Sequence, residues 1–198
     1  MTRSTYRLGL SLAVVGLTLS GLAACGDDPP TGDPTKTPDP TPTETATAEP
    51  TDTGPVEPEL PEAAKKPGRK GAEAFVRHYW VVVHYGLTSN EAGPLDRLGT
   101  DECDSCSTAS KLIRKYARLG YDVEMGPYEV QSAAAERILR NDYADNWQVT
   151  VRMTNAKETI RDKQGNVVRT GLPKRRNLVF QLQWRAEAWS ATSWNVVS

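Results

Sequence analysis

The aromatic residues of this chain are confined almost entirely to its C-terminal two thirds. All five tryptophans, both phenylalanines and six of the seven tyrosines lie between Gly68 and Ser198. Aromatic side chains supply much of the area that a core buries, so a cooperative fold is restricted to residues 68–198. This segment carries 19 basic and 15 acidic residues, a net charge of +4, and a domain of its size buries roughly two thirds of its unfolded surface.

Residues 25–67 have the composition of a disordered linker. Between Gly26 and Pro67 the chain has 11 of its 14 prolines, nine threonines, no aromatic residue and a net charge of −7. Such a segment cannot bury enough apolar surface to offset the entropy lost on ordering. Its prolines and like charges favour an extended conformation. We therefore expect a tether that holds the folded domain away from its point of attachment.

The first 24 residues predict an export signal. Arg3 and Arg7 precede an uncharged, apolar run over residues 8–24. The motif Leu22-Ala23-Ala24-Cys25 resembles the bacterial lipobox, whose cysteine receives a diacylglyceryl thioether and becomes the first residue after cleavage. The resemblance implies cleavage between Ala24 and Cys25 and a lipid anchor at Cys25 on the extracellular side of the cell membrane. An uncleaved membrane-spanning segment is the alternative for the same apolar run.

Apolar residues at helical spacing occupy the first third of the domain. They recur at intervals of three and four from Ala72 to Val83, and Gly86 is expected to end this helix. Thr88 or Ser89 is expected to cap a short second helix that reaches about Leu98. The pattern therefore predicts two helices before the middle of the domain.

A third helix and then a series of strands complete the pattern. Ser105 or Ser107 is expected to start the helix and Gly120 to end it. Beyond Gly120 the apolar period changes to two, with a hairpin tip at residues 162–166. The expected strands are Tyr121–Met125, Tyr128 to about Leu139, Trp147–Met153, Asn177–Trp184 and Ser190–Val197. Helices followed by antiparallel strands predict an α+β fold.

This arrangement resembles a known fold. Three helices followed by a curved antiparallel sheet are similar to the cone-shaped nuclear-transport-factor-2-like (cystatin-like) fold. More narrowly, the lipobox, the Thr/Pro linker and several domain residues resemble an uncharacterised domain family of actinobacterial lipoproteins. Those residues are Ala74-Phe75, Tyr79, Cys103-x-x-Cys106, Tyr116 and Gly120. The resemblance implies an extracytoplasmic domain without an established activity.

The pair Cys103 and Cys106 is the one motif with distinctive chemistry. Outside the cytoplasm two such thiols are normally oxidised, which favours a structural disulfide before the third helix. The functional alternative is a thioredoxin-like redox pair with a thiol at a helix N-terminus. Against it, no βαβ unit surrounds the pair, and Asp101, Glu102 and Asp104 disfavour a thiolate.

The other polar residues support no specific site. His78 and His84 lie six residues apart, on different faces of one helix, so neither a zinc site nor any other metal is expected. A pair of either histidine with Asp96 or Asp122 is conceivable on this scaffold. No nucleophile elbow or phosphate loop is present, and no cofactor is expected.

A basic run, Lys174-Arg175-Arg176, is interpreted as a solvated edge strand, and the alternative is a patch that binds an anionic wall polymer or a lipid head group. Binding to nucleic acid is not expected outside the cell. We expect a membrane-anchored, non-catalytic domain that binds a small ligand or a protein of the cell envelope. An enzyme on the same scaffold, or a redox protein that uses the cysteine pair, is the alternative.

Overall fold

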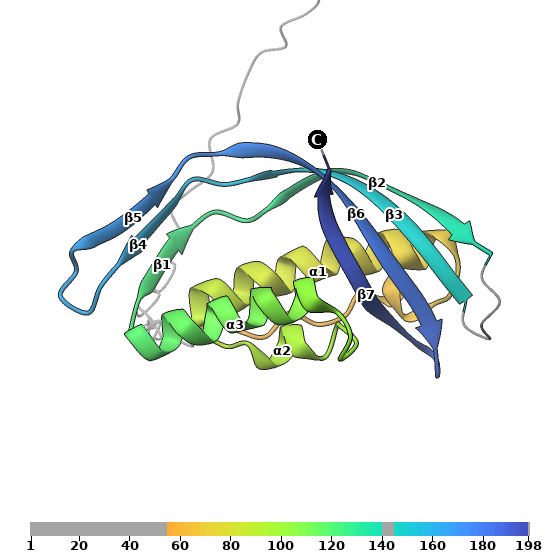
Figure 1. Cartoon of the computed structure of the whole chain (residues 1–198), viewed down its shortest axis with the longest axis horizontal. Coiled ribbons are helices and arrows are strands. Elements are labelled where there is room, and N and C mark those ends of the chain that lie inside the picture. The colour runs from red at the N-terminus through yellow and green to blue at the C-terminus, as the bar shows by residue number, and fades with distance from the viewer. Residues whose placement is uncertain (1–54, 140–144, 198) are drawn as a thin grey trace, which may run out of the picture. The chain divides into compact units, whose positions relative to one another are not determined.

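The protein is described by a computed structural model over residues 55–139 and 145–197, so the predicted signal segment and residues 25–54 lie outside the described residues. Helices come first and strands follow, which confirms the α+β class (Figure 1). The helical elements are η1 (Glu62–Lys65), α1 (Arg69–Ser89), α2 (Gly93–Asp96) and α3 (Asp104–Leu119). The strands are β1 (Asp122–Met125), β2 (Glu129–Ile138), β3 (Asp145–Asn155), β4 (Glu158–Arg161), β5 (Val167–Gly171), β6 (Lys174–Arg185) and β7 (Ala188–Val197).

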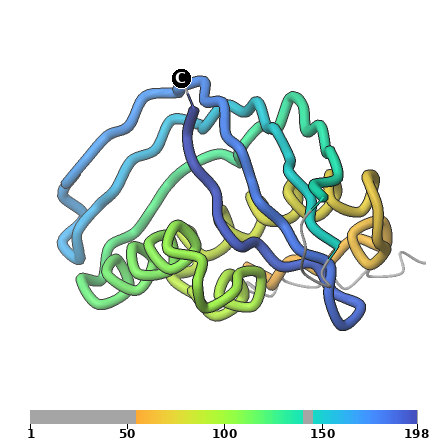
Figure 2. The backbone as a smooth tube through the Cα atoms, turned by 45° about the vertical axis from the view of Figure 1, so that its right-hand side comes forward, coloured from red at the N-terminus to blue at the C-terminus, as the bar shows by residue number. Residues whose placement is uncertain are grey.

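The strands form two antiparallel sheets that continue into each other. The larger sheet has the order β2-β3-β6-β7 and the smaller has the order β1-β4-β5. Short connections at residues 126–128, 156–157 and 172–173 carry the chain from one sheet to the other. The combined surface is therefore bent, and the helices lie on its concave side (Figures 1 and 2). The predicted packing of N-terminal helices on a curved antiparallel sheet is confirmed.

The central strands β3 and β6 supply the floor of the core. Trp147, Val149, Val151 and Met153 are buried, and polar residues alternate with them, as the sequence predicts. On β6 the buried positions are Leu178, Phe180 and Leu182. Side chains alternate between the faces of a strand, so these positions all face the helices. The strand expected from Tyr128 to about Leu139 is confirmed as β2, and it includes the alanine-rich segment 132–138.

The predicted end of α1 at Gly86 is wrong, because the helix continues to Ser89 and its C-cap is Asn90 in the left-handed conformation (φ 63°). Gly86 serves a different purpose. A Cβ atom there would lie 2.7 Å from Cδ1 of Ile113 and 2.9 Å from the carbonyl oxygen of Glu91. Its missing side chain thus allows α3 to approach α1 closely.

The predicted capping of the second helix by Thr88 or Ser89 is also wrong. Both hydroxyls donate hydrogen bonds to carbonyl oxygens of α1, Thr88 to His84 at 3.0 Å and Ser89 to Tyr85 at 2.7 Å. They therefore belong to the end of α1 and leave the start of α2 to Ala92. Serine and threonine make such bonds within a helix as readily as they cap one, which explains the error.

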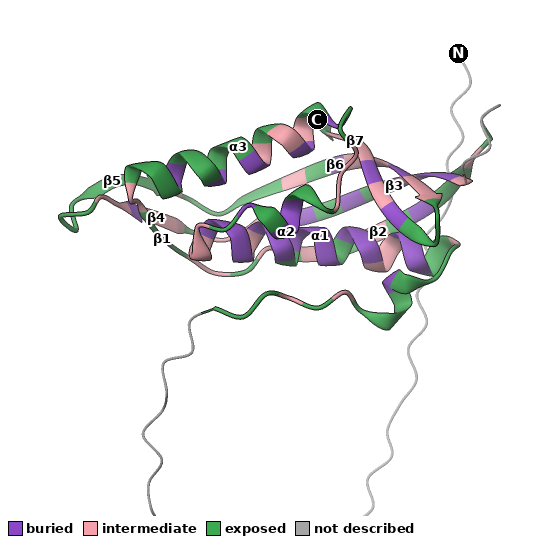
Figure 3. Ribbon diagram, turned by 90° about the horizontal axis from the view of Figure 1, so that it is seen from below, coloured by how far each residue is buried: buried purple, intermediate pink, exposed green. Residues whose placement is uncertain are grey.

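Helix α3 begins close to its expected position and ends where expected. It starts at Asp104, one residue before Ser105, with Cys103 at the N-cap. Gly120 is the C-cap, with φ 63°, which a glycine adopts without strain. The outer face of α3 is exposed and its inner face carries the buried residues (Figure 3).

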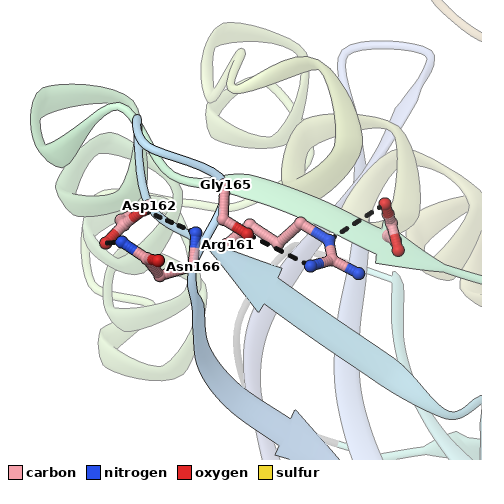
Figure 4. Close-up of polar contacts among 5 residues, drawn as sticks. Arg161, Asp162, Gly165 and Asn166 are labelled. Carbon is pink, nitrogen blue, oxygen red and sulfur yellow. Dashed lines mark hydrogen bonds and ion pairs between the residues drawn. The ribbon is translucent and has the colours of Figure 1, made fainter.

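The predicted hairpin tip at residues 162–166 is confirmed between β4 and β5. The Asp162 carboxylate accepts hydrogen bonds from the backbone N–H of Asn166 at 2.9 Å and from its side-chain amide at 3.0 Å (Figure 4). These bonds lower the pKa of Asp162, the side-chain bond most. Arg161 donates to the carbonyl oxygen of Gly165 at 3.2 Å and pairs with Glu124 of β1. The hairpin is thus tied both internally and to its neighbouring strand.

Part of the segment that composition assigns to the linker contacts the domain. Ala64 is buried, Leu60 packs against the core, and the carbonyl oxygen of Lys66 accepts a hydrogen bond from Nε1 of Trp189 at 2.9 Å. Glu57 forms an ion pair with Arg97. The packed region therefore begins before residue 68. Composition did not reveal this, because only two apolar residues, one carbonyl group and one carboxylate make these contacts.

We predict that the stability of the protein depends on residues 55–66 but not on the preceding linker. A chain that begins at residue 49 should melt at the same temperature as one that begins at residue 26. A chain that begins at residue 67 should lose about 2–3 kcal/mol, or about 5–10 °C in melting temperature, because Leu60, Ala64 and the bond to Trp189 are missing. Equal melting temperatures for all three, measured by circular dichroism, would contradict this.

Candidate functional site

The main candidate site is a cavity of about 630 Å³ on the concave side of the bent sheet. It lies between α3 and the strands, and α1, β3, β6 and β7 all contribute to its walls. We call it the concave pocket. Glu158 of β4 and Arg169 of β5 bring the smaller sheet into its lining, so the pocket spans the bend between the two sheets.

Aromatic rings form one wall of the concave pocket. The ring of Trp80 on α1 lies 5.0 Å from that of Tyr128 and 5.6 Å from that of Trp194, measured between centroids. Trp194 in turn stacks on Phe180 at 6.1 Å. Such contacts between rings are worth about 0.5–1.5 kcal/mol each beyond the area that they bury. The wall is therefore rigid and largely apolar.

Two hydrogen bonds hold Trp194 in place. Its indole N–H donates to the Tyr79 hydroxyl at 3.0 Å, and its backbone N–H donates to the Ser105 hydroxyl at 2.8 Å. Tyr79 lies on α1 and Ser105 on the first turn of α3, so β7 is attached to both helices. Burial raises the pKa of Tyr79 strongly, so its phenol stays neutral, while the hydrogen bond from Trp194 acts in the opposite direction.

Two buried polar atoms in the lining have no hydrogen-bond partner within residues 55–139 and 145–197. They are the indole nitrogen Nε1 of Trp80 and the side-chain oxygen Oδ1 of Asn155. Trp80 is 7% exposed, so its N–H is withdrawn from bulk solvent. A buried polar group without a partner costs about 1–3 kcal/mol. Both atoms are covered by protein, so other atoms of Trp80 and Asn155 form the surface of the cavity.

Charged residues gather at the end of the pocket near the bend. Glu158 forms an ion pair with Arg169, and the glycine at position 171 leaves room for the Glu158 carboxylate. Arg176 also lines the pocket, but among the described residues it makes no ion pair. Burial, and to a smaller degree Glu158, raise the pKa of Tyr128 to about 12, whereas Arg176 lowers it. The Tyr128 phenol is thus a neutral donor beside a cation that has no carboxylate partner in the described part of the chain.

Strand alternation divides the basic run at residues 174–176. Arg176 is level with Met153 of β3 and shares the inward face of β6 with Leu178, whereas Arg175 is exposed on the opposite face. The interpretation of this run as an edge strand is wrong, because β6 lies between β3 and β7. Counting alternate residues back from Leu178 could have placed Arg176 in the interior.

A second cavity of about 650 Å³ lies under residues 57–60, against α1 and α2. His78 and Arg97 line it, and Arg97 is paired with Glu57. Burial lowers the pKa of His78, and the nearby Glu57 opposes this effect. One wall of this cavity is the segment that carries the chain into the domain. The packing of that segment against the helices therefore explains why these residues come together in the second cavity.

Cys103 and Cys106 form a disulfide, with an S–S distance of 2.08 Å. Both residues are buried, and Cys103 Sγ accepts a hydrogen bond from the backbone N–H of Cys106 at 3.2 Å. The backbone of Gly99 covers the pair so closely that a Cβ atom there would lie 3.0 Å from Cys106 Sγ. Reactive cysteines are at least partly exposed, so this bridge has the surroundings of a structural staple.

The remaining candidate residues are not brought together. His84 contacts the carbonyl oxygen of Met125 at 3.2 Å, and Asp96 is paired with Arg114. His78 lies in the second cavity, and Asp122 is on β1 opposite Arg161. Within the described residues no three His, Cys, Asp or Glu side chains are grouped so as to hold a metal ion.

Ala24 and Cys25, the expected cleavage and lipidation positions, lie outside the described residues. In the part of the chain that the structure describes, no helix is long and apolar enough to cross a membrane. Sequence reasoning did not find the concave pocket itself. Its defining residues, Trp80, Asn155 and Arg176, come from three elements that only the fold unites.

Fold and pocket together define an α+β domain with a ligand-sized cavity on the concave side of its sheet. The chain belongs to a family of unknown function (DUF6318), whose pattern it matches over residues 42–195. No curated protein sequence matches it. The family match begins within the predicted linker, upstream of the segment that packs on the domain.

Several solved structures are similar in fold. The intermembrane space region of the chloroplast protein ARC6 has a TM-score of 0.48 and 14% identity, over 67% of this chain and 98% of that one. Aln2 from a Streptomyces species has a TM-score of 0.40 and 11% identity, over 62% and 86%. A putative calcium/calmodulin dependent protein kinase II association domain from Xanthomonas campestris has a TM-score of 0.37 and 12% identity, over 71% and 91%. Similarities this distant carry no conclusion about ligand or activity.

We predict that the disulfide stabilises the domain without taking part in binding. Replacement of both Cys103 and Cys106 by serine should lower the free energy of unfolding by about 1–3 kcal/mol, because the closed ring is short. The double variant should bind any ligand of the concave pocket as the parent does. Urea unfolding measures the first effect.

Alkylation of the reduced parent protein against pH provides the independent check. Thiols that react with a midpoint near the free value of about 8.5 or above fit a staple. A thiol that reacts with a midpoint near pH 6 would instead identify a redox-active pair.

Proposed function

We propose that this chain is a membrane-anchored, extracytoplasmic lipoprotein whose α+β domain binds a small ligand in the concave pocket. The single observation that carries the binding proposal is the pocket itself. Its volume of about 630 Å³ falls in the range of small-molecule sites, and its lining combines an aromatic wall with a few polar and charged side chains. Preformed cavities of this kind bind ligands with little rearrangement.

The lining favours binding over catalysis. Among the described lining residues Glu158 is the one carboxylate, and it is held by Arg169. A general base needs a free basic group and a nucleophile needs such a base beside it, and the described lining brings no histidine or cysteine to the cavity. The buried disulfide likewise favours a structural role over the redox alternative. Binding without chemistry is therefore the function that this geometry supports best.

The scaffold proposal rests on the order of the elements and on the place of the cavity. Three helices precede a bent antiparallel sheet and lie on its concave side, which resembles the nuclear-transport-factor-2-like cone. The pocket lies between sheet and helices, where a cone of this type is hollow. A small ligand fits this enclosed geometry better than the flat surface of an envelope protein does.

The anchor proposal rests on the sequence. The motif Leu22-Ala23-Ala24-Cys25 follows a basic start and an uncharged apolar run, and Gly26 and Asp27 continue it with small and polar residues. A diacylglyceryl group on Cys25 would supply two acyl chains, enough for stable attachment. The Pro- and Thr-rich segment between Cys25 and the domain would then hold the pocket away from the membrane surface.

We predict that filling the pocket abolishes binding of an apolar probe. Nile red, an uncharged dye that fluoresces in apolar surroundings, should bind the protein from residue 26 on, which lacks the apolar N-terminal segment and keeps every contact described above. Ala109 on α3 lines the pocket, so Ala109→Trp should weaken dye binding at least about tenfold by occupying the cavity.

The matched control is Ala117→Trp, an exposed position on the same helix that does not line the pocket. It should bind the dye as the parent does, and circular dichroism should show both variants folded. Equal binding by both variants, or no binding by the parent, would overturn the proposed ligand site.

We predict that Cys25→Ala releases the protein from membranes or leaves it as an uncleaved precursor. The substitution removes the thiol that would be acylated and leaves the apolar run intact. Detergent-phase partitioning and the mass of the N-terminal peptide measure the outcome. If the variant is cleaved and partitions into detergent like the parent, the lipid anchor at this residue is refuted.

A further inference from the structure

The concave pocket is polarised along its length. At one end Trp80, Ile113 and Leu178 surround it with apolar surface from α1, α3 and β6. At the other end, where the strands bend from the larger sheet into the smaller, the lining residues are Asn155, Glu158, Arg169 and Arg176. A ligand that fills the whole cavity therefore meets apolar surface at one end and charge at the other.

The charged end carries a net positive charge. Glu158 neutralises Arg169 through their ion pair, which leaves Arg176 without a counter-ion among the described residues. Lys174 occupies the next inward position of β6 and is exposed, so it adds to the positive potential outside this end. The domain as a whole has a net charge of +4, opposite in sign to the linker at −7.

Arg176 is only partly exposed, and it lines the pocket together with aromatic and apolar residues. Met153 is directly opposite it on β3, and Tyr128 is close enough for Arg176 to act on its pKa. An arginine withdrawn from water without a partner is unfavourable, because it loses hydration without gaining an ion pair. A bound anion would restore that partner, with two parallel hydrogen bonds for a carboxylate or phosphate.

A neutral group nearby suits the same head group. The phenol of Tyr128 lines the pocket and lies close enough to Arg176 for the arginine to act on its pKa. Its O–H is a donor, which an anionic oxygen accepts.

We propose that the ligand of the concave pocket is an anionic amphiphile, with an apolar body against the aromatic wall and a carboxylate or phosphate head paired with Arg176. This inference rests on the proposed function, since it names the class of ligand for that same pocket. Arg176 is the residue that determines specificity for the head group. The aromatic wall binds the body of the ligand whatever its charge.

The experiment compares probes with the same twelve-carbon chain and different head groups. Dodecanoate, dodecyl phosphate, methyl dodecanoate and dodecyltrimethylammonium are titrated, each below the concentration at which it forms micelles, into the protein from residue 26 on. Binding is read from the fluorescence of Trp80 and Trp194 and from displacement of Nile red. The two anions should bind about tenfold or more tightly than the neutral ester, and the cation most weakly.

Arg176→Gln should remove this preference. Dodecanoate should then bind no more tightly than its methyl ester, while the affinity for the ester stays unchanged. Arg175→Gln is the matched control, because the adjacent side chain lies on the opposite face of β6 and the same unit of charge is lost. It should retain the full preference for the anion.

Each outcome separates this inference from the function on which it rests. If Nile red and the ester bind but the anions are not preferred, the pocket binds apolar ligands and the role of Arg176 is refuted. Arg176→Gln variants that weaken acid and ester alike would also refute it, since the arginine would then only support the fold. If neither Nile red nor any amphiphile binds the parent, the proposed ligand site fails as well. A preference for dodecanoate over dodecyl phosphate, or the reverse, identifies the head group within the class.

Discussion

The fixation of Trp194 between two helices is the interaction on which the rest of this structure depends. Its indole N–H reaches Tyr79 on α1 and its backbone N–H reaches Ser105 on α3, so one residue of the edge strand β7 holds both helices at once. Tyr79 is fully buried and packs edge-on against Phe180. The position of α3 on the concave side of the sheet follows from this link, and with it the space that the concave pocket occupies (Figures 1 and 3).

The bend of the sheet explains why that space is polar at only one end. Strands that continue from one sheet into the other must pass through short connections, at which the regular alternation of inward apolar residues is interrupted. Asn155 is the last residue of β3 and Glu158 the first of β4, on either side of one such connection. Polar side chains are thus tolerated inside the curve because the chain turns there, whereas the centre of the sheet admits apolar residues.

Features that depend on local sequence were predictable, and those that depend on distant contacts were not. The inward residues of β3 and β6 follow from a period of two, and Gly120 ends α3 because a left-handed conformation is needed at that point. By contrast, Gly86 is small because Ile113 packs over it. The carbonyl of Lys66 is bound by Trp189, 123 residues further along the chain. No pattern within a short window contains that information.

The candidate site shows the same division. The disulfide between Cys103 and Cys106 was predictable, because the spacing of the two cysteines and the predicted export signal can both be read from the sequence. The pocket was not predictable. Helical periodicity does not distinguish Trp80 from the other apolar residues of α1, and the basic run suggests that Arg176 is exposed like its two neighbours. Both interpretations use only the helix or strand to which the residue belongs. The pairing of β6 with β3 shows that Arg176 is not on the outer face. It is level with Met153 and shares a face with Leu178, so it faces the helices whatever its charge. Arg176 has no ion-pair partner among the described residues, and this is the reason for proposing that a ligand anion pairs with it.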